Sequence, residues 1–264
     1  MHYFFRTCAL LSCLLYVPLI QATPTIINVQ YGSFVPNYST QFERQLRFKQ
    51  VPRADKAVLT TLTALGLRQQ NIDWLNSRIY DLSSPEQLKK RVMDILVDQY
   101  DLADNQTKYT LQGLMQFIKK STFGHRILMP LDPDITRLNP RLNPRLKGKW
   151  RILLKSGKHT NSITIMGNVF NPGIYQWHNF KSARFYLNDT DNMDNVNTEV
   201  TVIQPDGKIE THLVKQEGIL HFQDIAPGAI LYVPFSFISS SLHPLNTMED
   251  PNQLIIELLR NRIR

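Results

Sequence analysis

Cysteine is nearly absent from this sequence, and both cysteines, Cys8 and Cys13, lie within the first 22 residues. The same segment has one charge, Arg6, followed by an apolar run and the small residue Ala22. This layout is typical of a secretory signal peptide. We therefore expect residues 1–22 to be removed, which leaves a mature chain with neither a disulfide nor a catalytic thiol.

Patterns typical of metal sites and nucleophilic enzymes are also missing. None of the seven histidines stands at a zinc-type spacing from another. No glycine-rich loop has the pattern that cradles a phosphate. The serines at 239–241 lack the strand-turn-helix context of a nucleophile elbow. We expect no metal, no cofactor and no catalytic residue.

Positive charge is in excess. The formal net charge is +8, and without Arg6 the chain keeps 29 Lys and Arg against 22 Asp and Glu, a net charge of +7. A basic exported protein suits anionic partners such as acidic glycans or lipid head groups. Nucleic acid is a weaker interpretation, because no recognition motif accompanies the charge. A dispersed charge that only keeps the protein soluble is an equal alternative.

The same order of elements is predicted twice. A strand from Thr25, a second strand within 39–51 and a helix that ends at Gly66 form the first set. The second set begins with the stretch ITIMGNVFNPGIY at 163–175, followed by a short helix and a hairpin at Pro205-Asp206-Gly207. Two helices lie between the sets, at about 84–121. The fold class is therefore α+β, with one architecture used twice.

The tandem RLNP repeat at 137–144 is predicted to be a rigid, extended, basic connector.

The central stretch resembles the opening of a soluble-ligand-binding β-grasp domain, to which Gly167, Val169, Pro172, Gly173 and Tyr175 fit. More widely the chain resembles the GfcC-type capsule and exopolysaccharide biosynthesis family. The segments that carry this likeness are GHRILMPLDPDITR, NPRLKGKW, VIQPDG, PGAILYVPF and the ending LIIELLRNRIR.

The resemblance implies two β-grasp domains in a periplasmic protein, with no chemical reaction. The expected organisation is a signal peptide at 1–22, a first domain at 23–159 with a helical insertion at about 84–121, a second domain at 160–240 and a C-terminal amphipathic helix at 245–264. In this reading the chain takes part in polysaccharide assembly or export. It would bind the surface polysaccharide or outer-membrane polysaccharide export proteins, and not nucleic acid.

Arg126 is the residue that this resemblance singles out for a recessed pocket, where its planar fork could bind a carboxylate or phosphate. Asp132 and Asp134, which flank Pro133, are predicted to lie within its reach. Arg126 could equally pair with one of them and fasten the insertion to the sheet.

The two aspartates also define the enzyme alternative, a polysaccharide-modifying enzyme, since glycan hydrolysis uses carboxylates roughly 5–9 Å apart. We favour their ordinary use as hydrogen-bond acceptors in a turn. A purely structural adaptor is a third possibility.

The C-terminal helix is predicted to begin at Asp250-Pro251. Its apolar arc spans roughly 200°, which is wide for a helix that lies on one surface. The residues proposed for docking onto an export subunit or peripherally onto a membrane are Leu254, Ile255, Leu258, Leu259 and Arg262. The alternative is that this helix packs entirely within its own chain.

We predict cleavage between Ala22 and Thr23 during export to the periplasm. The alternative is an uncleaved N-terminal anchor, for which the apolar run is short. N-terminal sequencing of the periplasmic protein measures this directly. An intact Met1, or a lipid on Cys13, would contradict the prediction.

Overall fold

The computed structural model describes residues 24–32, 42–83, 87–157, 161–188, 199–214, 223–238 and 250–263. The expected signal peptide at 1–22 lies outside these residues.

The first sheet has five strands in the order β2-β1-β5-β3-β4. They are β1 (Thr25–Gly32), β2 (Phe42–Phe48), β3 (Ile72–Asp81), β4 (His125–Ile127) and β5 (Lys149–Ser156). The two central strands β1 and β5 are parallel, and the other pairs are antiparallel. Helix α1 (Ala54–Leu65) covers one face, where its apolar side packs on Ile27, Ile79 and Ile152. The 3-10 turn η1 (Gln69–Asn71) leads into β3.

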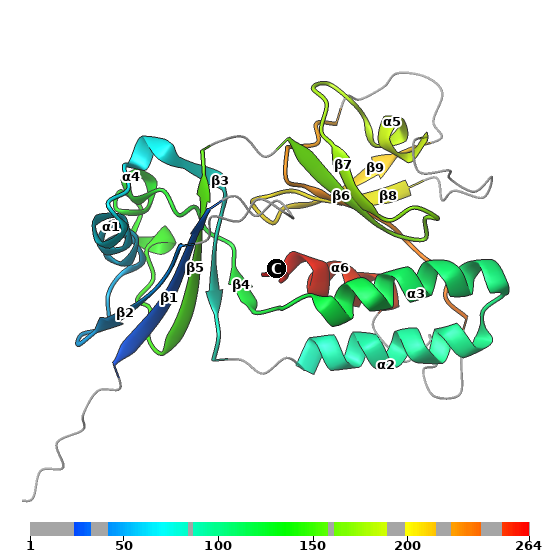
Figure 1. Ribbon diagram of the computed structural model, residues 1–264, viewed down its shortest axis with the longest axis horizontal. Coiled ribbons are helices and arrows are strands. Elements are labelled where there is room, and N and C mark those ends of the chain that lie inside the picture. The colour runs from blue at the N-terminus through cyan, green and yellow to red at the C-terminus, as the bar shows by residue number, and fades with distance from the viewer. Residues whose placement is uncertain are drawn as a thin grey trace, which may run out of the picture.

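The second sheet repeats this topology with the order β7-β6-β10-β8-β9. Its strands are β6 (Ser162–Gly167), β7 (Gly173–Gln176), β8 (Glu199–Ile203), β9 (Ile209–Leu213) and β10 (Ile230–Val233), and the short helix α5 (Ala183–Asn188) packs on it. Strands β6 and β10 form the parallel central pair. The α+β class and the repeated architecture are thus confirmed (Figure 1).

The opening hairpin of the second sheet needs a glycine at position 167. Its φ is 104°, and a Cβ there would lie 2.1 Å from the carbonyl oxygen of Val233 on the neighbouring strand β10. Gly167 therefore permits the close approach of the two central strands. Gly173, by contrast, has open space around it, so a side chain at that position would meet no neighbour.

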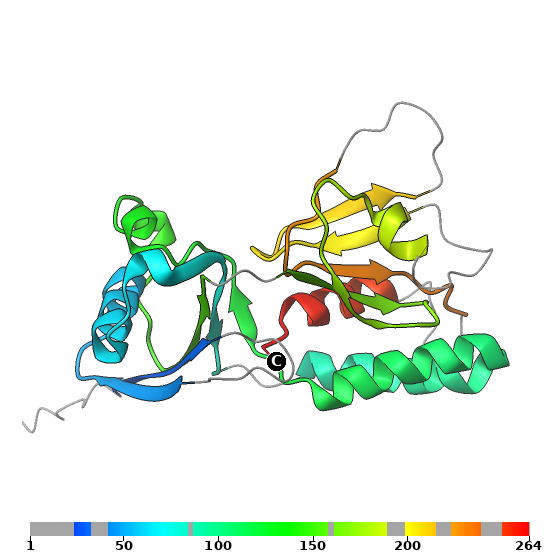
Figure 2. The ribbon, with the colours of Figure 1, turned by 45° about the horizontal axis from the view of Figure 1, so that its top comes forward.

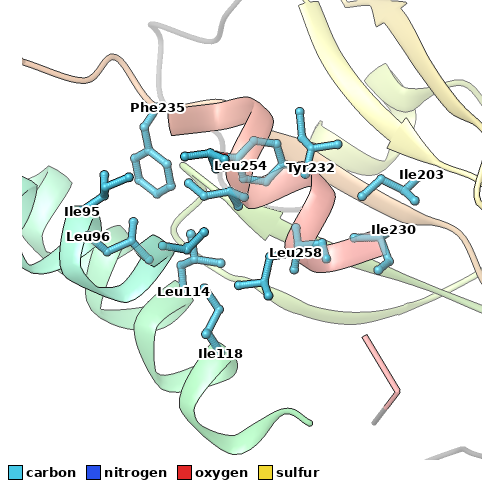
Figure 3. Packing of buried hydrophobic residues seen from close by; sticks show 14 of the residues in the cluster. Ile95, Leu96, Leu114, Ile118, Ile203, Ile230, Tyr232, Phe235, Leu254 and Leu258 are labelled. Atoms are coloured by element: carbon cyan, nitrogen blue, oxygen red, sulfur yellow. The ribbon is translucent and has the colours of Figure 1, made fainter. Parts of the chain in front are cut away.

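The predicted helical insertion is a pair of helices between β3 and β4, α2 (Gln87–Leu102) and α3 (Asn105–Lys120). It leaves the first sheet but packs beside the second one (Figure 2). The C-terminal helix α6 (Pro251–Arg260) lies between this pair and the second sheet. Apolar side chains from all these elements form one core, whose members include Leu96, Leu114, Ile230, Tyr232 and Leu258 (Figure 3).

Helix α6 begins as the sequence predicts, with the Asp250 carboxylate accepting a hydrogen bond of 2.9 Å from the backbone N–H of Asn252. Its apolar face, however, is already covered. Leu254 is 7% exposed, Ile255 and Leu258 1% each, and Leu259 0%. The proposal that these four side chains dock onto a partner or a membrane is therefore wrong, and the alternative of packing within the chain is confirmed.

The basic connector is not extended. It follows directly on the short helix α4 (Pro133–Thr136) and contains the 3-10 turn η2 (Pro140–Leu142). Asn143 is 5% exposed, and its side-chain oxygen accepts a hydrogen bond of 3.1 Å from the backbone N–H of Asp55 at the start of α1. Pro140 of the repeat starts this turn, since the φ of proline suits the first helical position.

None of the helices in the described ranges has both the length and the apolar character needed to cross a bilayer.

We predict that Leu259→Ala lowers the free energy of unfolding by about 2–5 kcal/mol, because it opens a cavity in the shared core. The matched control is Val97→Ala on α2, since Val97 is 51% exposed; it should change stability by less than about 0.5 kcal/mol. Chemical denaturation measures both. Equal, small effects would mean that α6 is not core.

Candidate functional site

A hollow of about 490 Å³ lies where the second sheet meets β3 of the first. Leu75 from β3 forms one wall. The rest comes from the β8–β9 hairpin and the irregular segment that leads towards β10, and comprises Gln204, Pro205, Asp206, Lys208, Glu210, Gln223, Asp224 and Ala226. The hairpin turn is the predicted Pro205-Asp206-Gly207, where the Asp206 carboxylate accepts from the backbone N–H of Lys208 at 2.9 Å.

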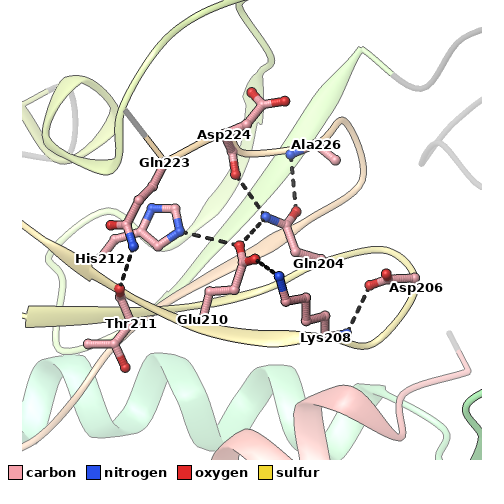
Figure 4. A network of polar contacts seen from close by, with 9 residues as sticks. All are labelled: Gln204, Asp206, Lys208, Glu210, Thr211, His212, Gln223, Asp224 and Ala226. Atoms are coloured by element: carbon pink, nitrogen blue, oxygen red, sulfur yellow. Dashed lines mark hydrogen bonds and ion pairs between the residues drawn. The ribbon is translucent and has the colours of Figure 1, made fainter. Parts of the chain in front are cut away.

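Glu210 is the centre of the polar network in this hollow (Figure 4). Its carboxylate pairs with the Lys208 ammonium at 2.7 Å and accepts from the Gln204 amide at 2.6 Å. His212 Nε2 lies 3.5 Å away. The Gln204 amide is fixed in turn, because it donates to the Asp224 carbonyl at 2.8 Å and accepts from the Ala226 N–H at 3.1 Å.

These contacts set the charges of the site. Burial raises the pKa of Glu210, but hydrogen bonds from Lys208, Gln204 and His212 outweigh it and leave that pKa below its ordinary value. Burial lowers the pKa of His212, which the Glu210 carboxylate only partly counters. At neutral pH Glu210 is therefore an ionised acceptor and His212 a neutral ring. A carboxyl with a lowered pKa is poorly suited to act as a general acid.

Arg126 lies underneath the same hairpin. It is 7% exposed, and its guanidinium donates to the carbonyl of Pro205. Its backbone N–H donates to the side-chain oxygen of Asn261, just after α6, at 2.9 Å. Burial, and then the charge of Arg78, lower the pKa of Arg126 to about 10. Arg126 thus fastens β4 to both the second domain and the C-terminal segment.

The predicted partnership of Arg126 with the two aspartates is not formed among the described residues. The Asp132 carboxylate instead accepts from the backbone N–H of Asp134 at 2.9 Å and caps α4. Asp134 pairs with Arg137 at 3.1 Å, and both side chains are exposed. The turn interpretation of the aspartates is therefore confirmed. Ligand binding by Arg126, Asp132 or Asp134 stays a prediction.

Arg262, the remaining predicted docking residue, does not extend into water. Its guanidinium lies 4.3 Å from the ring of Phe117 on α3, and its carbonyl accepts from the Tyr80 hydroxyl at 2.5 Å. Burial, and then the charge of Arg78, lower its pKa to about 10. Arg262 therefore belongs to the junction between the first sheet and α3.

The polar network around Glu210 was not predicted from the sequence. Its signal was present, because Lys208, Glu210 and His212 alternate along β9 and so lie on one face of the strand. What the pattern could not give is the opposing wall, which β3 and the 223–226 segment provide. Within the described ranges, acidic and histidine side chains form no group able to hold a metal ion.

Comparison with protein families identifies the chain. Residues 49–156 match the N-terminal part of the capsule biosynthesis protein GfcC, and residues 171–264 match its C-terminal part. The chain belongs to the GfcC capsule-biosynthesis family. It is also 27% identical over 124 residues to the uncharacterized protein YjbG of Escherichia coli (strain K12). That match covers 47% of this chain and 49% of YjbG, so the chain spans about half the length of this curated relative.

In this GfcC-family chain, the contact of the hairpin turn with the first domain depends on Gly207. Its φ is 92°, and a Cβ there would lie 2.4 Å from Leu128 Cδ2 and 3.4 Å from the Arg126 guanidinium carbon. We predict that Gly207→Ala lowers the free energy of unfolding by about 1–3 kcal/mol, because both the backbone and the contact are strained.

The control is Gly173→Ala, where the added methyl group meets open space. It should leave stability within about 0.5 kcal/mol of the parent. Thermal or chemical denaturation of the two variants gives the comparison. If Gly207→Ala were as stable as Gly173→Ala, the hairpin turn would not be held against the first domain.

Proposed function

We propose that this chain is a non-enzymatic periplasmic accessory protein of capsule or exopolysaccharide biosynthesis and export, and that it binds glycan in the hollow beside Glu210. Membership of the GfcC family supports the pathway. The observation that carries the binding role is the ionised, hydrogen-bonded carboxylate of Glu210 in a hollow of about 490 Å³.

The lining of the hollow supports recognition of hydroxyl groups. The carboxylates of Asp206, Glu210 and Asp224 and the amide of Gln223 border it, and carboxylate and amide oxygens accept hydrogen bonds from hydroxyl donors. Leu75 adds an apolar surface of the kind that packs on the carbon face of a sugar ring. A site of fixed polar groups around a small apolar surface is typical of small-ligand recognition.

The enzyme alternative has weaker support. Asp132 and Asp134 hold α4 and Arg137, so neither is poised as an acid or a base. Glu210 has a lowered pKa, whereas a catalytic acid needs a raised one.

We propose outer-membrane polysaccharide export proteins as the protein partners of this chain. The surfaces around the hollow, and not the buried face of α6, are then available to them.

A deletion strain tests the cellular role. We expect less polysaccharide at the cell surface and more polymer retained in the periplasm, because an accessory export factor is missing. Quantification of polymer in the two fractions measures this. Unchanged amounts in both fractions would contradict a role in export, and a shift in polymer chain length on incubation with pure protein would favour the enzyme.

The purified Glu210→Gln variant tests the site itself. We expect the purified variant to bind isolated surface polysaccharide about tenfold more weakly, since one charge-assisted acceptor is lost. Glu199→Gln is the control, as Glu199 lies exposed at the start of β8 outside the hollow. Calorimetry and thermal melts report binding and folding separately. If both variants bind as the parent does, the hollow is not the glycan site.

A further inference from the structure

The face of the first sheet that α1 does not cover carries a cluster of cations. On β3, Tyr80 pairs with Arg126 of β4 on one side and with Arg151 of β5 on the other. Arg78 pairs with Leu153, which places it diagonally between Arg151 and Lys155. Since residues directly opposite in a sheet share a face, these four cations lie on one surface.

Arg78 is the centre of this cluster. Its positive charge is the second cause, after burial, of the lowered pKa values of Arg126, Lys155 and Arg262. The pKa of Lys155 falls to about 8, and those of Arg126 and Arg262 to about 10. The cations therefore repel one another in a partly buried setting, where such repulsion is stronger than in water.

Three of the guanidinium groups on or beside this face have a donor without an acceptor. The Nε atoms of Arg78, Arg151 and Arg262 are buried without a hydrogen-bond partner. Within the described ranges, the side chains of Arg78 and Arg151 also form no ion pair. A buried donor that is left unpaired normally costs stability, so three in one cluster need an explanation.

The nearby acids are already engaged. Asp73 accepts from the side-chain amide of Asn76 at 2.8 Å and from its backbone N–H at 3.1 Å. Glu43 accepts from the side-chain amide of Gln30. Asp206 accepts from the Lys208 N–H at 2.9 Å. None of these hydrogen bonds involves the side chain of Arg78 or Arg151.

A hollow of about 320 Å³ opens this face to solvent at Arg151. It is lined by Asn28, Val29, Gln30, Glu43, Arg44, Gln45 and Arg151. The amide of Gln45 donates to the side-chain oxygen of Asn28 at 3.1 Å, so part of the floor is made of neutral hydrogen-bonding groups. This floor can bind hydroxyl groups, and the arginine can bind an anion.

We propose that this second hollow binds the oxyanion of an acidic saccharide, a carboxylate or phosphate group, with Arg151 as its direct contact and Arg78 as the charge behind it. The proposal rests on the proposed glycan function and adds the class of ligand to it. An arginine fork binds a carboxylate or phosphate by two parallel hydrogen bonds, which would give the Arg151 guanidinium an acceptor. The neutral amides bind the hydroxyl groups of the same sugar.

The test is calorimetric titration of the purified protein with methyl glucuronide, methyl glucoside and inorganic phosphate. We expect glucuronide to bind, glucoside not to bind, and the binding to weaken with added salt. Arg151→Gln should weaken glucuronide binding about tenfold through loss of the charge-assisted contact. Arg141→Gln, the same charge change on the exposed turn η2, should leave it unchanged.

Three outcomes would overturn the proposal. The first is equal binding of glucuronide and glucoside, and the second is an Arg151→Gln variant that binds glucuronide as the parent does. The third is Arg151-dependent binding of phosphate that is tighter than binding of glucuronide, which would assign the site to the free ion. If Arg151→Gln does not fold, the arginine Nε–Hε resonances of the parent protein report the contact by NMR. Glucuronide that shifts none of them would contradict the site.

The result is separable from the proposed export role. Glucuronide binding with normal export in the deletion strain would contradict the proposed function alone. Impaired export without glucuronide binding would contradict the acidic-saccharide site alone.

Discussion

The shared core of α2, α3, α6 and the second sheet is the constraint on which the rest of the structure depends. The inserted helices leave the first domain between β3 and β4, yet their apolar faces are buried with Ile230 and Tyr232 of the second sheet. Helix α6 fills the space between them, and Asn261 at its end holds the backbone of Arg126. Apolar burial of this extent fixes the two domains relative to each other. The hollow beside Glu210 needs that fixed placement, because Leu75 comes from one domain and Glu210 from the other.

Local signals in the sequence were enough to predict most elements, and they failed where a strand departs from regular alternation. The cap at Asp250, the stop at Gly66 and the turn at Pro205-Asp206-Gly207 each act within a few residues, so they are legible without the fold. Strand β3 was missed, because its pairing with β5 shifts register between Asp73 and Arg78. The polar residues at the shift are buried for tertiary reasons, as Ser77 accepts from the Lys155 N–H at 3.0 Å.

Periodicity shows which residues share a face but not what covers that face. The apolar arc of α6 is too wide for one surface, as predicted. The second surface, however, was wrongly inferred to be an export subunit or a membrane. The second surface is the α2–α3 pair of the same chain, which sequence separation concealed. Arg126 illustrates the same limit. Its acceptor is the carbonyl of Pro205, and a carbonyl belongs to every residue and leaves no mark in the sequence.

The two hollows differ in charge because different elements line them. Carboxylates that the β8–β9 hairpin presents dominate the first, and the second opens onto the cations around Arg78. The large core allows this second arrangement. Burial of apolar area contributes far more free energy than a few unpaired guanidinium donors cost, so the fold tolerates the repulsion around Arg78. If an anion binds at Arg151 as proposed, it reduces the net positive charge of this face, and its binding stabilises the folded chain in proportion to its affinity.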